Sequence, residues 1–330
     1  LQMFERLIIL AGVAALYFSG SIDVRSAVIC YIVGSAAIML VGVVQLRSVI
    51  FRRFTLDSEI FKKTLVYSLP LLPYWFVGFL SGNYVDAAFI SKFLSKADLG
   101  VYAVATQING IAMQVPTIAN TILLPLLLTQ EAETQGERSF HFFRHILPPI
   151  VLAWGAACSI LASLGYFFIP LVFKTEFTGA VLPLWILLAS SVFWIPVAVG
   201  YAAFANATSA TYISLVASCF AAAANIAANF YLIPKYGMVG CAWATFAAYA
   251  ASVIIFAVLL RRESGMPYSW TFLAFVPSLV GAVIVSYELP IWAFVGCIAS
   301  SVLIAIYRRD SISELYGFVS GFWRTANATG

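Results

Sequence analysis

The chain has 330 residues, of which 62% are apolar and only 10% are charged. Soluble globular proteins carry about 25% charged residues, so the composition excludes a soluble domain and favours a protein that lies almost wholly in a membrane. The net charge of +4 does not indicate a nucleic-acid partner, because the places of the 18 lysines and arginines matter more than their sum.

Ten apolar segments, bounded by charged residues, glycines or prolines, approach the roughly 20 residues that a helix needs to cross about 30 Å of hydrocarbon. The period-two alternation of a membrane barrel is absent. The sequence therefore predicts an all-α polytopic membrane protein with about ten transmembrane helices. In chain order the expected spans are 4–20, 26–46, 65–90, 99–128, 146–173, 181–205, 210–233, 238–260, 270–287 and 290–307.

The connections between these spans are short. The two longest, 47–64 and 129–145, have fewer than twenty residues, so no soluble catalytic domain fits between the spans. When the loops are assigned to alternate sides, 13 of the 18 lysines and arginines fall on one side and 5 on the other. Cytoplasmic loops carry the excess of positive charge, so both ends of this chain are expected in the cytoplasm.

Asp86 follows a long apolar run and lies near the end of the third span. A charge at the centre of a bilayer costs about 2.5–3.5 kcal/mol, but Asp86 is expected only about one turn from the periplasmic end, with Lys92 and Lys96 nearby. We expect Asp86 to hold the outer ends of two neighbouring helices in register, as a structural or gate residue. Binding of substrate by Asp86 is the alternative.

Small and polar residues recur on one face of the span 99–128 and on one face of the span 210–233. Close packing between membrane helices explains the small residues. Amides are harder to explain in this way, because an unpaired amide in hydrocarbon costs several kcal/mol. The candidates for lining a polar cavity are therefore Gln107, Gln114, Asn225 and Asn229, with helix packing as the alternative.

Two stretches outside the spans have helical patterns. After Arg309, apolar residues recur at helical spacing, which predicts an amphipathic helix at the membrane interface. Glu137, His141 and His145 are spaced four residues apart and could place three metal ligands on one helix face. Because phenylalanines surround them, an interfacial segment explains this stretch better, and we predict no metal site.

No set of side chains indicates catalysis. The sequence lacks a pair of carboxylates, a Ser/His/Asp set and a glycine-rich phosphate loop in one plausible site. We therefore expect neither catalytic residues nor a cofactor, and the protein is not expected to be an enzyme.

Three stretches, in this order and spacing, are similar to one known family. They are SLPLLP at 68–73, KADLGVYA at 96–103 behind Asp86, and NFYLIPKYGMVGCAWAT at 229–245. Together they resemble the polysaccharide-exporter branch of the multidrug/oligosaccharidyl-lipid/polysaccharide (MOP) exporter superfamily, most strongly over 60–260. Proteins of that family typically have two six-helix lobes around a central cavity, followed by two further helices.

The resemblance implies that this chain corresponds to helices 5–14 of the fourteen-helix exporter fold. The first four helices are then expected to precede Leu1, in a longer protein. The implied parts are the last two helices of the N-terminal lobe (1–46), a cytoplasmic linker between lobes (47–64), the six-helix C-terminal lobe (65–262), two additional helices (263–307) and an amphipathic cytoplasmic tail (308–330).

The resemblance also implies a function. It implies a flippase that carries an undecaprenyl-diphosphate-linked oligosaccharide, such as an O-antigen, capsule or exopolysaccharide repeat unit, across the bacterial inner membrane by alternating access. Its partners would be that lipid-linked substrate, the lipid bilayer and other polysaccharide-assembly membrane proteins. A multidrug cation antiporter of the same superfamily and a membrane-embedded polymerase or glycosyltransferase are the alternatives.

One feature departs from what a lipid diphosphate requires. Its phosphates should meet lysine or arginine side chains in the cavity, yet none lies in the middle of a span. Lys92 and Lys174, at helix ends, are the candidate interface cations in this chain. Otherwise the cations lie in the missing helices, or the substrate differs.

Overall fold

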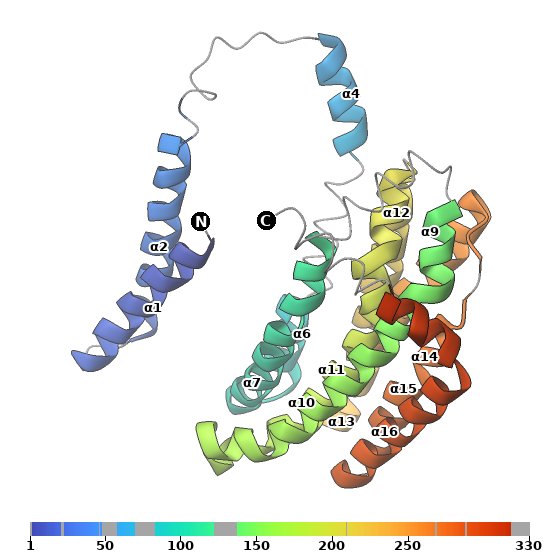
Figure 1. Cartoon of the computed structure of the whole chain (residues 1–330). Helices are drawn as coiled ribbons and strands as arrows, with labels where there is room; N and C mark the ends of the chain where they lie inside the picture. The colour runs from blue at the N-terminus through green and yellow to red at the C-terminus, as the bar shows by residue number, and fades with distance from the viewer. Residues whose placement is uncertain are drawn as a thin grey trace. The chain divides into compact units, whose positions relative to one another are not determined.

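The structure is a computed structural model. It describes residues 2–20, 23–45, 47, 58–69, 83–121, 137–208, 210–267, 269–287 and 289–317. All regular secondary structure within these residues is helical, which confirms the predicted all-α class. The chain divides into two compact units, 1–64 and 65–330, which are described separately (Figure 1). The domain boundaries predicted from the sequence stay predictions.

The first unit is a pair of packed helices, α1 (Gln2–Phe18) and α2 (Val24–Gln45). A methyl group at Gly12 would lie 3.1 Å from Sγ of Cys30, so glycine lets the two helices approach closely at this point. Apolar side chains such as Ile32 and Leu40 are exposed, as expected for helix faces that meet lipid. A third helix, α4 (Ser58–Ser68), follows in sequence.

The predicted span 65–90 is described only at its two ends. The first end is α4 and the second is α6 (Asn83–Phe93). Residues 70–82, with most of the SLPLLP stretch, lie outside the described residues. The next helix, α7 (Lys96–Ala112), follows after a two-residue turn, and residues 114–121 are helical as well.

The core of the second unit is built around α11 (Val181–Pro196), which lies in its middle (Figure 1). This helix contacts α7, α13, α15 (Val276–Val285) and α10 (Leu147–Phe173). It carries apolar side chains on all sides, and those of Leu184, Ile186 and Leu188 are fully buried. A helix that is apolar all round is expected at the centre of a bundle.

Two π-helical turns interrupt the long helices and pack against each other. The first, η1 (Phe142–Ile146), joins α9 (Glu137–His141) to α10, and the second, η3 (Val197–Tyr201), joins α11 to α12 (Ala202–Ala207). A methyl group at Gly200 would lie 2.7 Å from the ring of Phe143, so only glycine fits at this contact. The Phe143 ring also packs edge-on against Phe204, at 5.2 Å between centroids.

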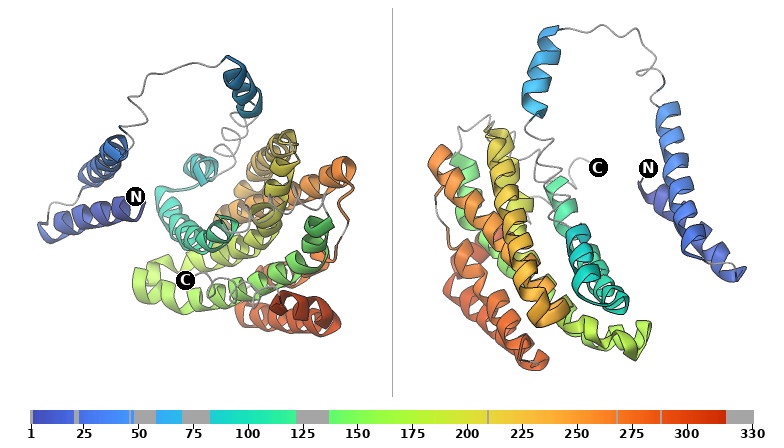
Figure 2. Two further views of the ribbon diagram at one scale, coloured as in Figure 1. Left: turned by 45° about the horizontal axis from the view of Figure 1, so that its top comes forward. Right: turned by 180° about the vertical axis from the view of Figure 1, so that it is seen from behind.

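The element α13 (Tyr212–Ser264) is an antiparallel hairpin with two arms, 212–236 and 238–264. Gly237 has φ 58° and ψ −137°, a conformation that favours glycine, and it forms the turn. At the open end, the Tyr212 hydroxyl donates to Glu263 Oε1 over 2.5 Å. Helix α13 contacts α6, and the two are seen from behind in Figure 2. The two spans predicted on either side of this turn agree with the arms.

The last helices cover α10 and α11. They are α14 (Thr271–Ala274), α15 and α16 (Pro290–Tyr307), followed by a helical segment, 309–317, which we call the tail helix. The Ser159 hydroxyl on α10 donates to Sγ of Cys297 on α16 over 2.6 Å. The predicted amphipathic tail is described only to residue 317, and the rest of it lies outside the described residues.

Five described helices are long and apolar enough to cross a membrane. They are Val28–Gln45, Ser139–Phe173, Thr175–Asn206, Tyr212–Ser264 and Pro290–Tyr307. The fourth of these is the α13 hairpin and therefore contributes two arms. Leu7–Phe18 and Thr271–Val285 are shorter apolar helices. This set of helices is that of a multi-pass membrane protein.

Candidate functional site

The Asp86 side chain lies inside the second unit and is 2% exposed. It is in the first turn of α6, seven residues before the end of that helix at Phe93. The sequence predicted a helix end at residue 90, about one turn from Asp86. The helix continues for three more residues, and the Leu94 N–H still donates to the Ile90 carbonyl over 2.8 Å. Asp86 is thus about two turns from the helix end, rather than the one turn expected.

The carboxylate of Asp86 accepts four side-chain hydrogen bonds. Oδ2 accepts from the hydroxyls of Thr245, at 2.8 Å, and Tyr102, at 3.2 Å. Oδ1 accepts from Nδ2 of Asn229, at 3.0 Å, and of Asn225, at 3.3 Å. We call these five residues the Asp86 cluster.

Four helical segments supply the Asp86 cluster. Asn225 and Asn229 are four residues apart on the first arm of α13, so their side chains share one helix face, and both are fully buried. Thr245 comes from the second arm and Tyr102 from α7. The close approach of the arms depends on Gly240, because a methyl group there would lie 2.3 Å from the Leu232 carbonyl oxygen.

The turn between α6 and α7 fixes where Tyr102 lies relative to Asp86. Ser95 caps α7, with its hydroxyl accepting from the Asp98 N–H over 3.1 Å. Asp98 Oδ2 in turn accepts from the Ser95 N–H over 3.0 Å. This reciprocal pair is a capping box, which fixes the first turn of the helix and therefore the place of Tyr102 one turn later.

The Asp86 cluster has no positive charge to balance the carboxylate. Among the described residues, no lysine, arginine or histidine forms an ion pair with Asp86. Its four partners are neutral amides and hydroxyls. In addition, Oδ1 of Asn229 is buried without a hydrogen-bond partner. A buried carboxylate with neutral partners and a nearby unpaired oxygen make a site that a positive charge would stabilise.

The four amides predicted from the sequence separate into two pairs. Asn225 and Asn229 lie in the Asp86 cluster, where they are enclosed and bond the carboxylate. Gln107 and Gln114 are on an exposed face of the second unit and are not part of this cluster. For the glutamines, the cavity-lining role stays a prediction.

The two candidate interface cations lie apart from Asp86. Lys92 is exposed near the end of α6, and its Nζ lies 5.5 Å from the ring centroid of Phe93 and 5.8 Å from that of Phe230. Lys174 is exposed in the connection after α10, with φ 71°. Their role as phosphate contacts stays a prediction.

Tyr102 and Thr245 are site residues that the sequence pattern did not indicate. Both lie within the stretches that carry the family resemblance, KADLGVYA and NFYLIPKYGMVGCAWAT. The signal in the sequence that could have indicated them is that each of these stretches contains a polar residue. Their contact with Asp86 could not be seen, because helical periodicity assigns a residue to a face without giving the helix that it meets.

The fold is similar to that of known transporters. A structure described as “Lipid II flippase MurJ, inward closed conformation” matches with a TM-score of 0.60 and 16% identity, over 94% of this chain and 67% of that chain. A MOP superfamily transporter from Pyrococcus furiosus matches with a TM-score of 0.50 and 16% identity, over 77% of this chain and 67% of that chain. At 16% identity, these structural likenesses show a shared fold. The comparison with curated proteins finds no match.

The family resemblance seen in the sequence is confirmed by an independent match. A family described as “Polysaccharide biosynthesis protein” matches residues 7–182, which is more than half of the chain. The fold of the same chain is similar to that of a MOP superfamily transporter. The protein therefore belongs to the polysaccharide biosynthesis protein family.

Proposed function

We propose that the protein flips a lipid-linked oligosaccharide across the bacterial inner membrane by alternating access. The observation that carries this proposal is the combination of a polysaccharide-biosynthesis family with a fold like that of a lipid II flippase, over 94% of the chain. The substrate class is an undecaprenyl-diphosphate-linked repeat unit of a surface polysaccharide. Other membrane proteins of polysaccharide assembly are the expected partners, and both ends of this chain are expected in the cytoplasm.

We further propose that the Asp86 cluster binds one positive charge that is coupled to transport. The carboxylate has only neutral partners, and the unpaired Oδ1 of Asn229 lies beside it. Turning the Asn225 and Asn229 amides would direct their oxygens towards the same point as Asp86. Together with the Thr245 hydroxyl, these groups would form the all-oxygen ligand set that alkali and alkaline-earth cations prefer. A proton bound to Asp86 would neutralise the same negative charge.

Binding of a charge at Asp86 would be coupled to transport through the helices that the Asp86 cluster joins. Asp86 connects α6 to α7 and to both arms of α13. Neutralising the carboxylate changes the strength of all four contacts at once. The relative stability of two arrangements of these helices then depends on whether the charge is bound.

A multidrug cation antiporter of the same superfamily is the second candidate function. It is favoured by the presence of a buried acid, which such a transporter would need. Against it, the 2% exposure of Asp86 leaves no room for an organic cation at the carboxylate. The Asp86 cluster thus fits a small cation or a proton better than a drug.

Complementation tests the proposed function. The full-length gene should restore surface polysaccharide to a flippase-null strain, while lipid-linked repeat units stop accumulating in the inner leaflet. Failure of this rescue together with gained dye resistance would establish the antiporter instead. A matched Asp310→Asn variant changes an exposed acid of the tail helix, outside the Asp86 cluster, and should still rescue.

Thermal unfolding of the purified protein tests the bound charge. If a metal cation binds, sodium chloride raises the unfolding midpoint above that in choline chloride, and Asp86→Asn abolishes this difference. If a proton binds, the midpoint varies more strongly with pH in the wild type than in Asp86→Asn, without a specific effect of sodium. If neither difference is found, the coupling role of Asp86 is wrong, whereas rescue by complementation would still support the flippase.

A further inference from the structure

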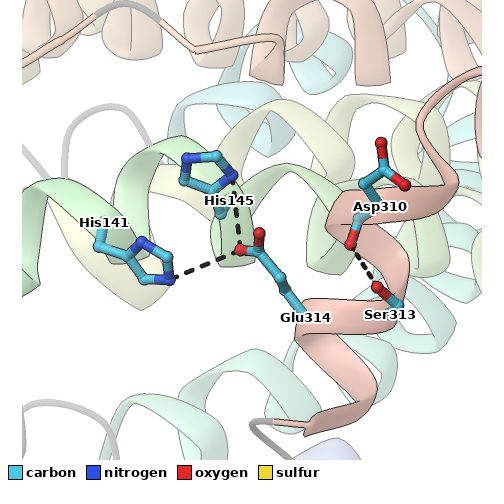
Figure 3. Close-up of polar contacts among 5 residues, drawn as sticks. All are labelled: His141, His145, Asp310, Ser313 and Glu314. Atoms are coloured by element: carbon cyan, nitrogen blue, oxygen red, sulfur yellow. Dashed lines mark hydrogen bonds and ion pairs between the residues drawn. The ribbon is translucent and has the colours of Figure 1, made fainter.

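Two histidines and a glutamate that are far apart in the sequence meet at one oxygen atom (Figure 3). Nε2 of His141 lies 3.5 Å from Oε2 of Glu314, and Nδ1 of His145 lies 3.4 Å from the same oxygen. The two imidazole rings are stacked, with centroids 4.9 Å apart and planes inclined by 23°. The histidines come from α9 and η1, and the glutamate comes from the tail helix.

In the sequence, the same histidines have helical spacing with Glu137, whose side chain lies outside the described ones. A metal ion does not suit the arrangement with Glu314. Imidazole lone pairs lie in the ring planes, and rings stacked at 4.9 Å cannot direct them to one ion at about 2.0–2.1 Å from each nitrogen. Among the described residues, no group of three His, Cys, Asp or Glu side chains is arranged to hold a metal.

The Glu314 oxygen is buried and lacks a short hydrogen bond. Oε2 has no hydrogen-bond partner, and its 3.4 and 3.5 Å distances exceed the roughly 2.7–2.9 Å of charge-assisted N–H···O bonds. The carboxylate oxygen thus lies between two imidazole rings. Adding a proton to either ring would place a positive charge beside a negative one.

The histidines are the charge-changing groups nearest to Glu314. The other charged residues on α9, η1 and the tail helix, with Arg308 before it, are Glu137, Arg138, Arg144, Arg308, Arg309 and Asp310. The side chains of the first two lie outside the described ones, and none of the other four forms an ion pair with Glu314. The neighbouring helices α10 and α16 contain no charged residue.

The contact holds the tail helix over an apolar groove. A cavity of about 260 Å³ lies between α10, α16 and the tail helix. Its walls include Leu152 of α10, Ile298 and Val302 of α16, and Ile312 and Leu315 of the tail helix. Displacing the tail helix would remove one wall and open this groove.

We propose that His141, His145 and Glu314 form a proton-dependent latch that holds the tail helix over the groove between α10 and α16. Histidine is the side chain whose charge normally changes between about pH 5 and 8. At the acidic end of this range, an imidazolium attracts the Glu314 carboxylate and the latch is tight. At the alkaline end, the rings are neutral and only the apolar contacts of the tail helix remain.

Hydrogen–deuterium exchange of the full chain in lipid nanodiscs tests the latch. After correction for intrinsic exchange rates, amides of 309–317 should exchange about two- to fivefold more slowly at about pH 6 than at about pH 8. Glu314→Gln should abolish this difference, and so should His141→Gln combined with His145→Gln. Asp310→Asn, an exposed acid on the same helix, should preserve it.

Three results would overturn the latch. Equal corrected protection of the tail helix at both pH values is the first, and a pH difference that survives in Glu314→Gln is the second. The third is loss of the difference when a chelator is added, since this would show that a metal joins the three side chains. Exchange in the core of α11, measured in the same samples, shows whether each variant is folded.

Discussion

The Asn229 amide donates to the Asp86 carboxylate over 3.0 Å, although 143 positions separate the two residues in the chain. The same amide also donates to Oδ1 of Asn225 over 3.0 Å. One asparagine thus connects the acid of α6 to the neighbouring amide of α13. This connection makes the Asp86 cluster sensitive to small changes in any of its members.

Two substitutions of Asp86 should distinguish the effect of its charge from the effect of its hydrogen bonds and packing. Asp86→Ala removes the acceptor of four donors, and each buried donor left unpaired costs about 1–3 kcal/mol. We expect a large fall in the unfolding midpoint in detergent. Asp86→Asn keeps the size and one acceptor oxygen, so we expect a folded protein that no longer restores surface polysaccharide. A folded Asp86→Asn variant with full transport would reject a functional role for this charge.

Removing the Thr245 hydroxyl should destabilise the protein through Asp86. Thr245→Val keeps the shape but deletes the 2.8 Å donor, and we expect a loss of about 1–3 kcal/mol of unfolding free energy. Thr245→Ser should retain most of the stability. Thr117→Val is the matched control, because the exposed Thr117 hydroxyl donates only to the Met113 carbonyl of its own helix. Equal effects at the two sites would contradict this account.

The two arms of α13 should separate if Gly240 gains a side chain. The added methyl group would lie 2.3 Å from the Leu232 carbonyl oxygen, which is backbone and cannot turn aside. We expect Gly240→Ala to cost about 1–3 kcal/mol, measured by chemical unfolding. Gly110→Ala is the control, since no atom lies within 4 Å of the added methyl group. That change should be neutral or stabilise by up to about 1 kcal/mol.

The exposed glutamines offer a test of the cavity prediction. Because Gln107 and Gln114 are exposed, replacing both by leucine should change the unfolding free energy by no more than about 0.5 kcal/mol for each residue. If they line the substrate path, the double variant should lose rescue of the flippase-null strain. Ile111→Leu, at an exposed position between them, should keep it. Full rescue by the double variant would show that these amides face lipid or a packing partner.

The sequence predicted much of the helix framework. Hydrophobic runs bounded by glycine and proline placed the last span at 290–307, where α16 lies, and placed a break between 233 and 238, where Gly237 turns the chain. These features are local, because the length of an apolar run and the backbone freedom of glycine can be judged without neighbours. The end of α6 was placed three residues too early, because Ser91 and Lys92 are polar yet remain helical.

The candidate site was less predictable because its contacts are not local. Two glutamines and two asparagines had the same pattern in the sequence, yet the structure buries only the asparagines. Burial depends on which helices are neighbours, and neither composition nor periodicity gives that. The partnership of His141 and His145 with Glu314 was missed for the same reason, since the nearest acid in sequence was Glu137.

The one-residue turn at Gly237 bears on how the protein is made. The chain is synthesised from its N-terminus, so Asp86 and Tyr102 enter the membrane long before the α13 hairpin exists. A hairpin without a loop is suited to enter as a preformed pair of helices, and it carries Asn225, Asn229 and Thr245 together. Three of the four partners of Asp86 are therefore expected to enter the membrane together. Until then, Tyr102 of α7 is the one member of the Asp86 cluster that can bond the acid.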